Sequence, residues 1–446
     1  MRTSSPFMRW YILAVLTLAN VCGFVDRQVL SLLVVPIERD LGISDTQMSY
    51  LLGLSFAVFY SVLGLPIAAW ADRANRRTII AGGVALWSVM TMLSGLARTY
   101  RRLLWTRIGV GVGEATLNAP AVSLLADSFP ADRLGVAMSV YSLGVFLGSG
   151  LAYFLGGWAV GLVSGAERWV WPVIGAVQPW QSVFLIVGAP GLGVALLLLT
   201  IRDPRSSGAR SAVTSAAAPP VTPRVTLFRH VWAHRRAFLT HHLGFALSAT
   251  VNYGIAAWLA TYFVRRHGWT PARAGMVQGV LTMTVGVAGV LVGGRVADWL
   301  GRRGRVDAPL RVGIIGAIGM LVSASAYPLM PSATGAVAWL AIVNFFAAFP
   351  WGAATAAIAV MVPAPMRAQG AALYFLVLNL VSAALGPTAV AVVTEFVFRD
   401  PGSLGYALAL VNAAGMTGTI VLLRLGLNAY VDTVEHVRRA AAARVA

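Results

Sequence analysis

The chain has 446 residues, of which 58% are hydrophobic and only 11% charged, against about 25% charged in soluble globular domains. This composition excludes an ordinary soluble protein. The net charge of +18 does not indicate nucleic acid, because the basic residues gather in short segments between apolar runs and form no face interleaved with aromatics. A single cysteine, Cys22, excludes an intramolecular disulfide.

Twelve apolar runs are long enough to cross a bilayer, which takes about 20 residues. They are expected at residues 10–35, 48–70, 78–97, 103–126, 134–160 and 181–201, then at 237–264, 274–297, 310–329, 336–362, 368–396 and 404–427. We predict an all-α membrane protein of twelve transmembrane helices in two six-helix pseudo-symmetric halves. The first run is expected to be an anchor rather than a cleaved signal peptide. Kinks are expected at Pro120, Pro350 and Pro387.

The two halves are expected at residues 1–201 and 237–430, joined by a cytoplasmic linker at 202–236 that is rich in Pro, Ser, Ala and Arg. A cytoplasmic tail follows at 431–446, either as a short basic amphipathic helix on the inner surface or as a frayed end. The arginine placement puts both termini in the cytoplasm, in a bacterial-type inner membrane.

One segment is repeated between the halves. AAWADRANRR (Ala68–Arg77) recurs as GGRVADWLGRR (Gly293–Arg303), and each copy closes the second helix of its half. Two parallel halves are typical of one large transporter class. Seven charged residues of the two copies are predicted to form a conformational gate, with solvated loop charge as the alternative. They are Asp72, Arg73, Arg76, Arg77, Asp298, Arg302 and Arg303.

The repeated loop resembles the signature loop of the major facilitator superfamily, although the first copy has Ala68 and Asn75 where the family has glycines. The segments ADRANRR, RIGVGVGEATLNAPAV and RLGVAMSVYSLGVFLGSG resemble the Spinster branch, over roughly residues 26–157. The resemblance implies a proton-linked carrier of lysophospholipids, sphingoid phosphates or similar amphiphiles. It carries over to Asp26, Arg27, Arg107 and Glu114, and more loosely to Thr250, Gly254 and Trp351.

Four ionisable residues, Asp26, Arg27, Arg107 and Glu114, lie inside apolar runs, where each costs ~2.5–3.5 kcal/mol if unpaired. Arg107 and Glu114 are about 10.5 Å apart along one helix, so each needs a partner elsewhere. We expect an Asp26–Arg107 pair. Asp26 and Glu114 are then predicted to carry protons with Arg107 as counter-ion, and Arg27 to bind an anionic headgroup. A static buried network is the alternative.

The second half has no acid or arginine at membrane-centre depth and offers aromatic and amide side chains instead. One charged wall and one apolar wall fit an anionic amphiphile. For each aromatic, lipid contact or core packing is the alternative. The predicted substrate-binding residues are Arg27, Tyr141, Thr250, Asn252, Gly254, Phe349, Trp351 and Asn379.

The sequence therefore predicts a monomeric, proton-coupled secondary transporter of an anionic amphiphile, working by alternating access of two helix bundles and surrounded by membrane lipid. No cofactor, metal or nucleic-acid partner is expected, because Gly109–Ala115 lacks dinucleotide spacing and His241–His242 lack further ligands. The predicted spans contain no arrangement of a nucleophile and a base, so we do not predict an enzyme. The rivals are an exporter of apolar drug-like compounds and a non-transporting membrane sensor.

Overall fold

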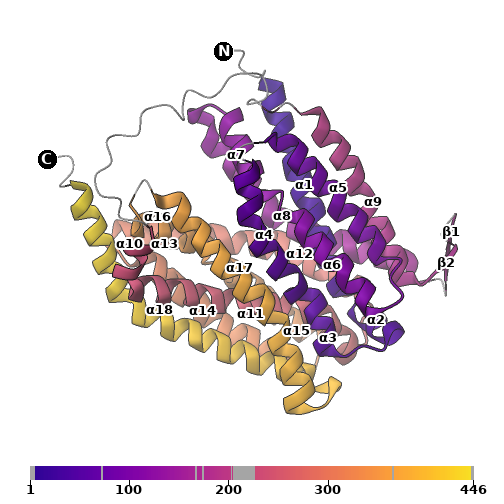
Figure 1. Cartoon of the computed structure of the whole chain (residues 1–446). Coiled ribbons are helices and arrows are strands. Elements are labelled where there is room, and N and C mark those ends of the chain that lie inside the picture. The colour runs from indigo at the N-terminus through magenta and orange to yellow at the C-terminus, as the bar shows by residue number, and fades with distance from the viewer. Residues whose placement is uncertain are drawn as a thin grey trace. The chain divides into compact units, whose positions relative to one another are not determined.

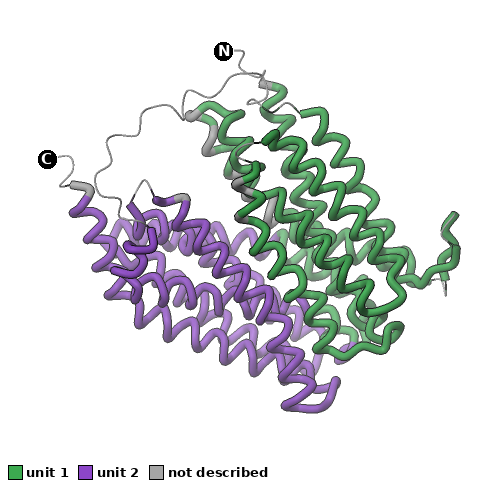
Figure 2. Tube along the Cα trace, in the orientation of Figure 1, with its two compact units in different colours: residues 1–220, 259–264, 268–283 green, residues 221–258, 265–267, 284–446 purple. Residues whose placement is uncertain are grey.

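The computed structural model describes residues 6–71, 74–165, 168–172, 175–201, 203, 227–363 and 366–442, and nearly all of them are helical (Figure 1). The chain forms two compact units (Figure 2). Unit 1 comprises residues 1–220, 259–264 and 268–283. Unit 2 comprises residues 221–258, 265–267 and 284–446.

Unit 1 contains ten helices among its described residues. They are α1 (Pro6–Leu32), α2 (Val34–Leu41), α3 (Asp45–Ser49), α4 (Ser55–Ala71), α5 (Arg76–Ser94), α6 (Tyr100–Glu114), α7 (Asn118–Ser128), α8 (Ala131–Val163), α9 (Pro179–Thr200) and α12 (Pro271–Leu281). A π-helical segment, Tyr50–Leu54, joins α3 to α4. Strands β1 (Trp169–Trp171) and β2 (Gly175–Val177) form a small antiparallel hairpin with Trp169 opposite Val177.

Unit 2 contains most of α11 and the remaining helices. They are α10 (Leu227–Ala233), α11 (Arg235–His267), α13 (Val287–Arg302), α14 (Ala308–Ala326), α15 (Ala333–Ala348), α16 (Trp351–Met361), α17 (Arg367–Val392) and α18 (Leu404–Ala442). Short π-helical segments lie at Thr282–Gly286 and Val393–Phe398, and 3₁₀ turns at Tyr327–Leu329 and Pro401–Ser403.

Within the described ranges, eleven helical segments are long and apolar enough to cross a membrane, and α8 adds a shorter apolar stretch, Leu147–Val163. In chain order these twelve correspond to the twelve predicted runs. The hairpin β1–β2 lies in the connection between the fifth and sixth of them and was not predicted.

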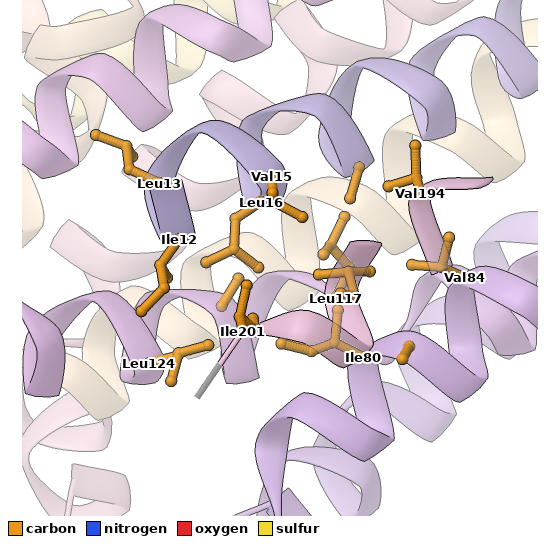
Figure 3. Packing of buried hydrophobic residues seen from close by; sticks show 14 of the residues in the cluster. Ile12, Leu13, Val15, Leu16, Ile80, Val84, Leu117, Leu124, Val194 and Ile201 are labelled. Atoms are coloured by element: carbon orange, nitrogen blue, oxygen red, sulfur yellow. The ribbon is translucent and has the colours of Figure 1, made fainter. Parts of the chain in front are cut away.

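The core of unit 1 forms along one stripe of α1. Ile12, Val15, Leu16 and Ala19 recur at helical spacing, and all are buried. Figure 3 shows this stripe among apolar side chains of α5, α7 and α9 and of the turn before α7. The labelled partners are Ile80, Val84, Leu117, Leu124, Val194 and Ile201. The charged residues of α1 lie farther along the same helix, so this packing fixes their position.

Glycines allow α5 and α6 to approach closely. A Cβ atom added to Gly83 would lie 1.7 Å from Thr116 Oγ1 and 2.7 Å from the Gly113 carbonyl oxygen. One added to Gly113 would lie 2.8 Å from the Gly83 carbonyl oxygen. Small residues at such contacts let helix backbones pack where lipid supplies no hydrophobic drive. Gly83 of α5 and Gly113 of α6 therefore lie at a close helix contact.

Two predicted kinks are complete breaks in the helix. The fourth span divides at Ala115–Leu117, between α6 and α7, because Pro120 has no N–H and its ring clashes with the carbonyl four residues earlier. The tenth span divides in the same way at Phe349–Pro350. By contrast, α17 runs unbroken through Pro387. The break before α7 places Glu114 at a helix end.

The predicted tail helix is not separate. Helix α18 continues without interruption through Tyr430 to Ala442. The residues after Tyr430 therefore belong to the last spanning helix, and they are helical as far as Ala442. After Gly426 no glycine or proline interrupts the sequence, and Ala and Arg favour helix. Its 39 residues span about 58 Å, well beyond a hydrocarbon core of about 30 Å. The polar carboxyl-terminal part therefore extends past the apolar layer.

The helix contact predicts opposite effects for two adjacent glycines. Gly83→Ala should destabilise the protein by about 1–3 kcal/mol, because the new methyl meets backbone atoms of α6. Gly82→Ala should be neutral or stabilise by up to about 1 kcal/mol, since nothing lies within 4 Å of its Cβ position. Thermal unfolding of the purified variants measures both, and equal midpoints would contradict the packing described here.

Candidate functional site

Helices α1 and α6 bring the four predicted charged residues into the interior of unit 1. Asp26, Arg107 and Glu114 are 2%, 1% and 3% exposed. Arg27 differs from them, since a quarter of its side chain is accessible. Three of the four charged side chains are therefore buried, and Arg27 is partly accessible.

An ion pair joins Arg27 to Glu114, with both Nε and Nη2 of the arginine directed at Oε2. Gly23, one turn before Arg27, lies beside the carboxyl, since a Cβ atom there would be in van der Waals contact with Glu114 Cδ at 3.7 Å. Glu114 is the last residue of α6. The break after it lets its side chain reach α1.

The predicted Asp26–Arg107 ion pair is not formed in the described part of the chain. Arg107 Nη1 instead donates to the backbone carbonyl of Asp26 at 3.5 Å, and Asp26 Oδ1 has no hydrogen-bond partner. The reason is helix geometry: successive residues point about 100° apart, so when Arg27 faces Glu114 the Asp26 carboxyl is turned aside. The ion pair that forms joins Arg27 to Glu114, whereas the predicted pair was Asp26–Arg107.

Three aromatic rings surround the Arg27 guanidinium. Its Cζ lies 4.3 Å from the ring centroid of Phe56, 5.2 Å from that of Tyr60 and 5.7 Å from that of Phe24. Cations are attracted to aromatic faces at these distances, more strongly where water is excluded. Phe56 and Tyr60, stacked on α4, were not among the predicted residues. Their spacing of four, which places them on one helix face, could have revealed them.

Two hydrogen bonds connect Tyr60, one of these three aromatic residues, to Asn118 and Tyr141. Asn118 Nδ2 donates to Tyr60 Oη at 2.8 Å, and Tyr141 Oη donates to Asn118 Oδ1 at 3.3 Å. Tyr141 was predicted as a substrate residue and is nearly buried. Asn118 was not predicted, because its place at the start of α7 depends on the break in the fourth span. In unit 1, successive contacts therefore connect Glu114 to Tyr141 through Arg27, Tyr60 and Asn118.

In unit 2, Thr250 and Gly254 lie where α11 packs on α17. Thr250 Oγ1 donates to Ala246 O within the helix at 2.8 Å. A Cβ atom on Gly254 would lie 3.0 Å from Gly386 O, and one on Gly386 would lie 2.5 Å from Thr250 O. Close helix contact accounts for both residues.

The two predicted amides of unit 2 are partly accessible. Asn252 Nδ2 donates to Ser248 O at 3.0 Å. Asn379 Oδ1 accepts from Tyr253 Oη at 3.5 Å, and its Nδ2 donates to Phe375 O at 2.8 Å. The structure thus brings Asn379 together with Tyr253 across α11 and α17.

The predicted aromatics of the tenth span have different surroundings. Phe349 is buried in a small core with Val312 and Ala353. Its backbone carbonyl would lie 1.9 Å from a Cβ atom on Gly293. Trp351 is 43% exposed. Phe349 therefore packs within unit 2, as its alternative assignment stated, while Trp351 remains accessible.

The gate residues of the first repeat copy are partly described: Asp72 and Arg73 lie outside the described residues. Arg76 is fully buried and binds Asp203 through Nη2 at 2.6 Å and Nε at 3.2 Å. Its Nη1 donates to Asp127 at 2.7 Å. Arg77 reaches the carbonyls at the end of α9 at 3.3 Å. Asp127 and Asp203 were not predicted.

The second copy shows no such network among the residues described. Asp298, Arg302 and Arg303 are exposed, and Arg303 Cζ stacks 3.9 Å from the ring centroid of Trp299. The two copies are therefore similar in sequence but differ in their ion-pair arrangement among the residues described.

A family model described as the major facilitator superfamily matches residues 16–387. The chain belongs to the major facilitator superfamily. An MFS-type efflux pump of Mycolicibacterium smegmatis is 29% identical over 413 residues, covering 92% of this chain and 90% of that protein. Protein spinster homolog 1 of Homo sapiens is 31% identical over 344 residues, covering 72% of this chain but only 60% of that protein.

A crystal structure of a bacterial homologue of the human lysosomal transporter Spinster, inward-facing and unoccupied, matches with a TM-score of 0.75 and 29% identity. The match covers 98% of both chains. The predicted twelve-helix facilitator fold and the predicted Spinster resemblance are confirmed. This facilitator is accordingly a multi-pass membrane protein of a secondary-transporter family.

The buried network of Arg76 predicts a large loss of stability when the arginine is removed. Arg76→Gln takes the guanidinium charge away from the Asp203 carboxylate, which is 1% exposed, and should cost about 3–5 kcal/mol. The control Arg439→Gln breaks a surface pair with Glu435 and should cost about 1 kcal/mol or less. Unfolding midpoints in detergent compare the two, and similar losses would show that the Arg76 network contributes no more than a surface pair.

Proposed function

We propose that this facilitator carries an anionic amphiphile of the lysophospholipid or sphingoid-phosphate class and couples its movement to protons. The observation that supports this most is the buried Arg27–Glu114 pair, in which the arginine keeps a quarter of its side chain accessible. A guanidinium fork suits a phosphate as well as it suits a carboxylate.

Coupling follows from the cost of separating the pair. Removing one partner of a buried ion pair costs about 3–5 kcal/mol, because the other charge is left desolvated. A proton on Glu114 without an anion on Arg27 is therefore unfavourable, and so is the reverse. When a proton binds Glu114 and an anionic headgroup binds Arg27, both residues are again neutralised. The proton and the headgroup are therefore expected to bind jointly. Asp26, with an unpartnered Oδ1, is proposed as a second proton acceptor, and Arg107 as the counter-ion.

The surroundings of Arg27 supply the rest of the substrate contacts. Phe24, Phe56 and Tyr60 offer apolar surface next to the charge, and Asn118 and Tyr141 offer polar groups beside it. Of the predicted residues in unit 2, we propose Asn252, Trp351 and Asn379, which remain accessible, as further substrate contacts, and the repeated loops as the gate. We propose a monomer in the inner membrane with both termini in the cytoplasm, working by alternating access.

A second candidate is an exporter of apolar drug-like compounds, favoured by the similarity to the efflux pump of Mycolicibacterium smegmatis over 92% of the chain. The two functions differ in whether an anionic headgroup is required. Arg27→Ser should reduce transport of a lysophospholipid about 10–100-fold, the loss of one charge-assisted contact of about 1.5–3 kcal/mol. Arg439→Ser, at an exposed pair, is the matched control. Unchanged lysophospholipid flux in Arg27→Ser would favour the drug exporter.

Proton coupling is tested with Glu114→Gln in liposomes that contain a pH-sensitive dye. In the wild type, lysophospholipid flux should move protons, and its apparent affinity should weaken as the pH rises and Glu114 loses its proton. Both effects should be strongly reduced in Glu114→Gln, where Asp26 is the remaining proposed acceptor, and unchanged in Glu435→Gln, an exposed control. Lysophospholipid flux that moves no protons in the wild type would refute the coupling.

A further inference from the structure

A surface pocket of about 400 Å³ lies in unit 2, where α10 meets α11 beside the end of α18. It is separate from the charged residues of unit 1. Its volume is within the range of small-molecule sites. The lining residues are Ala233, His234, Arg235, Arg236, Ala237, Ala429, Asp432 and Thr433.

The pocket carries a net positive charge. Arg235 and Arg236 are exposed, and Asp432 is the one acid among the lining residues. Arg235 is turned back toward α10, where its Nη1 donates to Trp232 O at 3.5 Å and its Cζ lies 5.8 Å from the Trp232 ring centroid. Both arginines line the pocket, and a guanidinium group suits a phosphate.

The histidine of the pocket is held in place by its neighbours. The His234 ring lies 4.8 Å from that of His230 and 5.1 Å from that of His436. Its Nδ1 is 3.4 Å from Thr433 Oγ1. Burial, together with His230 and His436, lowers the pKa of His234, so the arginines supply the positive charge at neutral pH.

An aromatic pair stands next to this pocket. Phe228 and Trp232 of α10 are 75% and 63% exposed, one helical turn apart, and their rings stack at 6.1 Å. Exposed aromatics beside arginines are typical of a helix lying at a bilayer interface. The facing part of α18 is the polar end that extends past the apolar layer. The pocket therefore lies at headgroup depth.

We propose that this pocket binds the phosphodiester of an anionic phospholipid from the adjacent leaflet, with phosphatidylglycerol as the fitting chemistry. Arg235 and Arg236 hold the phosphate, a headgroup hydroxyl donates to Asp432, and Phe228 and Trp232 lie along the upper part of the acyl chains. This resident lipid is distinct from the transported substrate. Its site does not depend on the roles proposed for Arg27 and Glu114.

Binding can be measured on the full chain in detergent from the rise in unfolding midpoint with short-chain phosphatidylglycerol. The wild type should respond more to it than to phosphatidylcholine with the same chains. Arg235→Gln with Arg236→Gln should weaken the apparent affinity about thirtyfold, at about 1 kcal/mol for each basic residue. Arg438→Gln with Arg439→Gln removes the same charge outside the pocket and should leave the affinity unchanged.

Two further arms separate the sources of phosphate. Trp232→Ala should weaken binding of the lipid and should not change any effect of inorganic phosphate on the unfolding midpoint. If inorganic phosphate saturates the midpoint shift and lipid adds nothing to it, the lipid assignment is overturned. An undiminished affinity in the Arg235, Arg236 double variant would overturn the site. If that variant unfolds without lipid, Arg236→Gln alone can be used instead, and it should weaken the apparent affinity about fivefold.

Discussion

The structure of unit 1 is organised around one constraint, which is that ionised groups inside a membrane must be neutralised by a partner. A charge at the centre of a spanning helix costs at least ~2.5 kcal/mol on insertion scales, and Asp26, Arg27, Arg107 and Glu114 are all inside spans. The Arg27–Glu114 pair relieves part of that cost and joins α1 to α6. The same requirement makes the pair sensitive to anything that neutralises one of its members.

Several features of the fold serve this contact. Gly83 and Gly113 bring α5 against α6, which carries Glu114. Pro120 ends the helical ladder just after Glu114, so the carboxyl sits at a helix end and Asn118 begins the next helix. The aromatic rings of α4 then cover the other face of Arg27. Small residues, a proline and two aromatics thus give one arginine two kinds of neighbour, an anion and an apolar surface.

Much of this was predictable from the sequence, and the failures have physical reasons. Apolar runs and the repeated loop gave the twelve spans and the superfamily, because length and arginine placement are constraints of the bilayer itself. The pairing was predicted wrongly, because it depends on helix rotation: a turn of about 100° decides whether Asp26 or Arg27 faces α6. Asn118, Phe56, Asp127 and Asp203 were missed because each acts through a neighbour distant in sequence. The similar sequences of the two loop copies likewise gave no sign that Arg76 would be buried with acids while Arg302 and Arg303 would be exposed.

The exchange proposed for the Arg27–Glu114 pair is tested most directly by the number of protons taken up when substrate binds. A lysophospholipid is added to the purified protein in weakly buffered detergent, and the proton change is followed with a pH dye. The account predicts proton uptake in step with lipid binding in the wild type and a much smaller uptake in Glu114→Gln. Saturable binding of the lipid to the wild type without any proton uptake would contradict it.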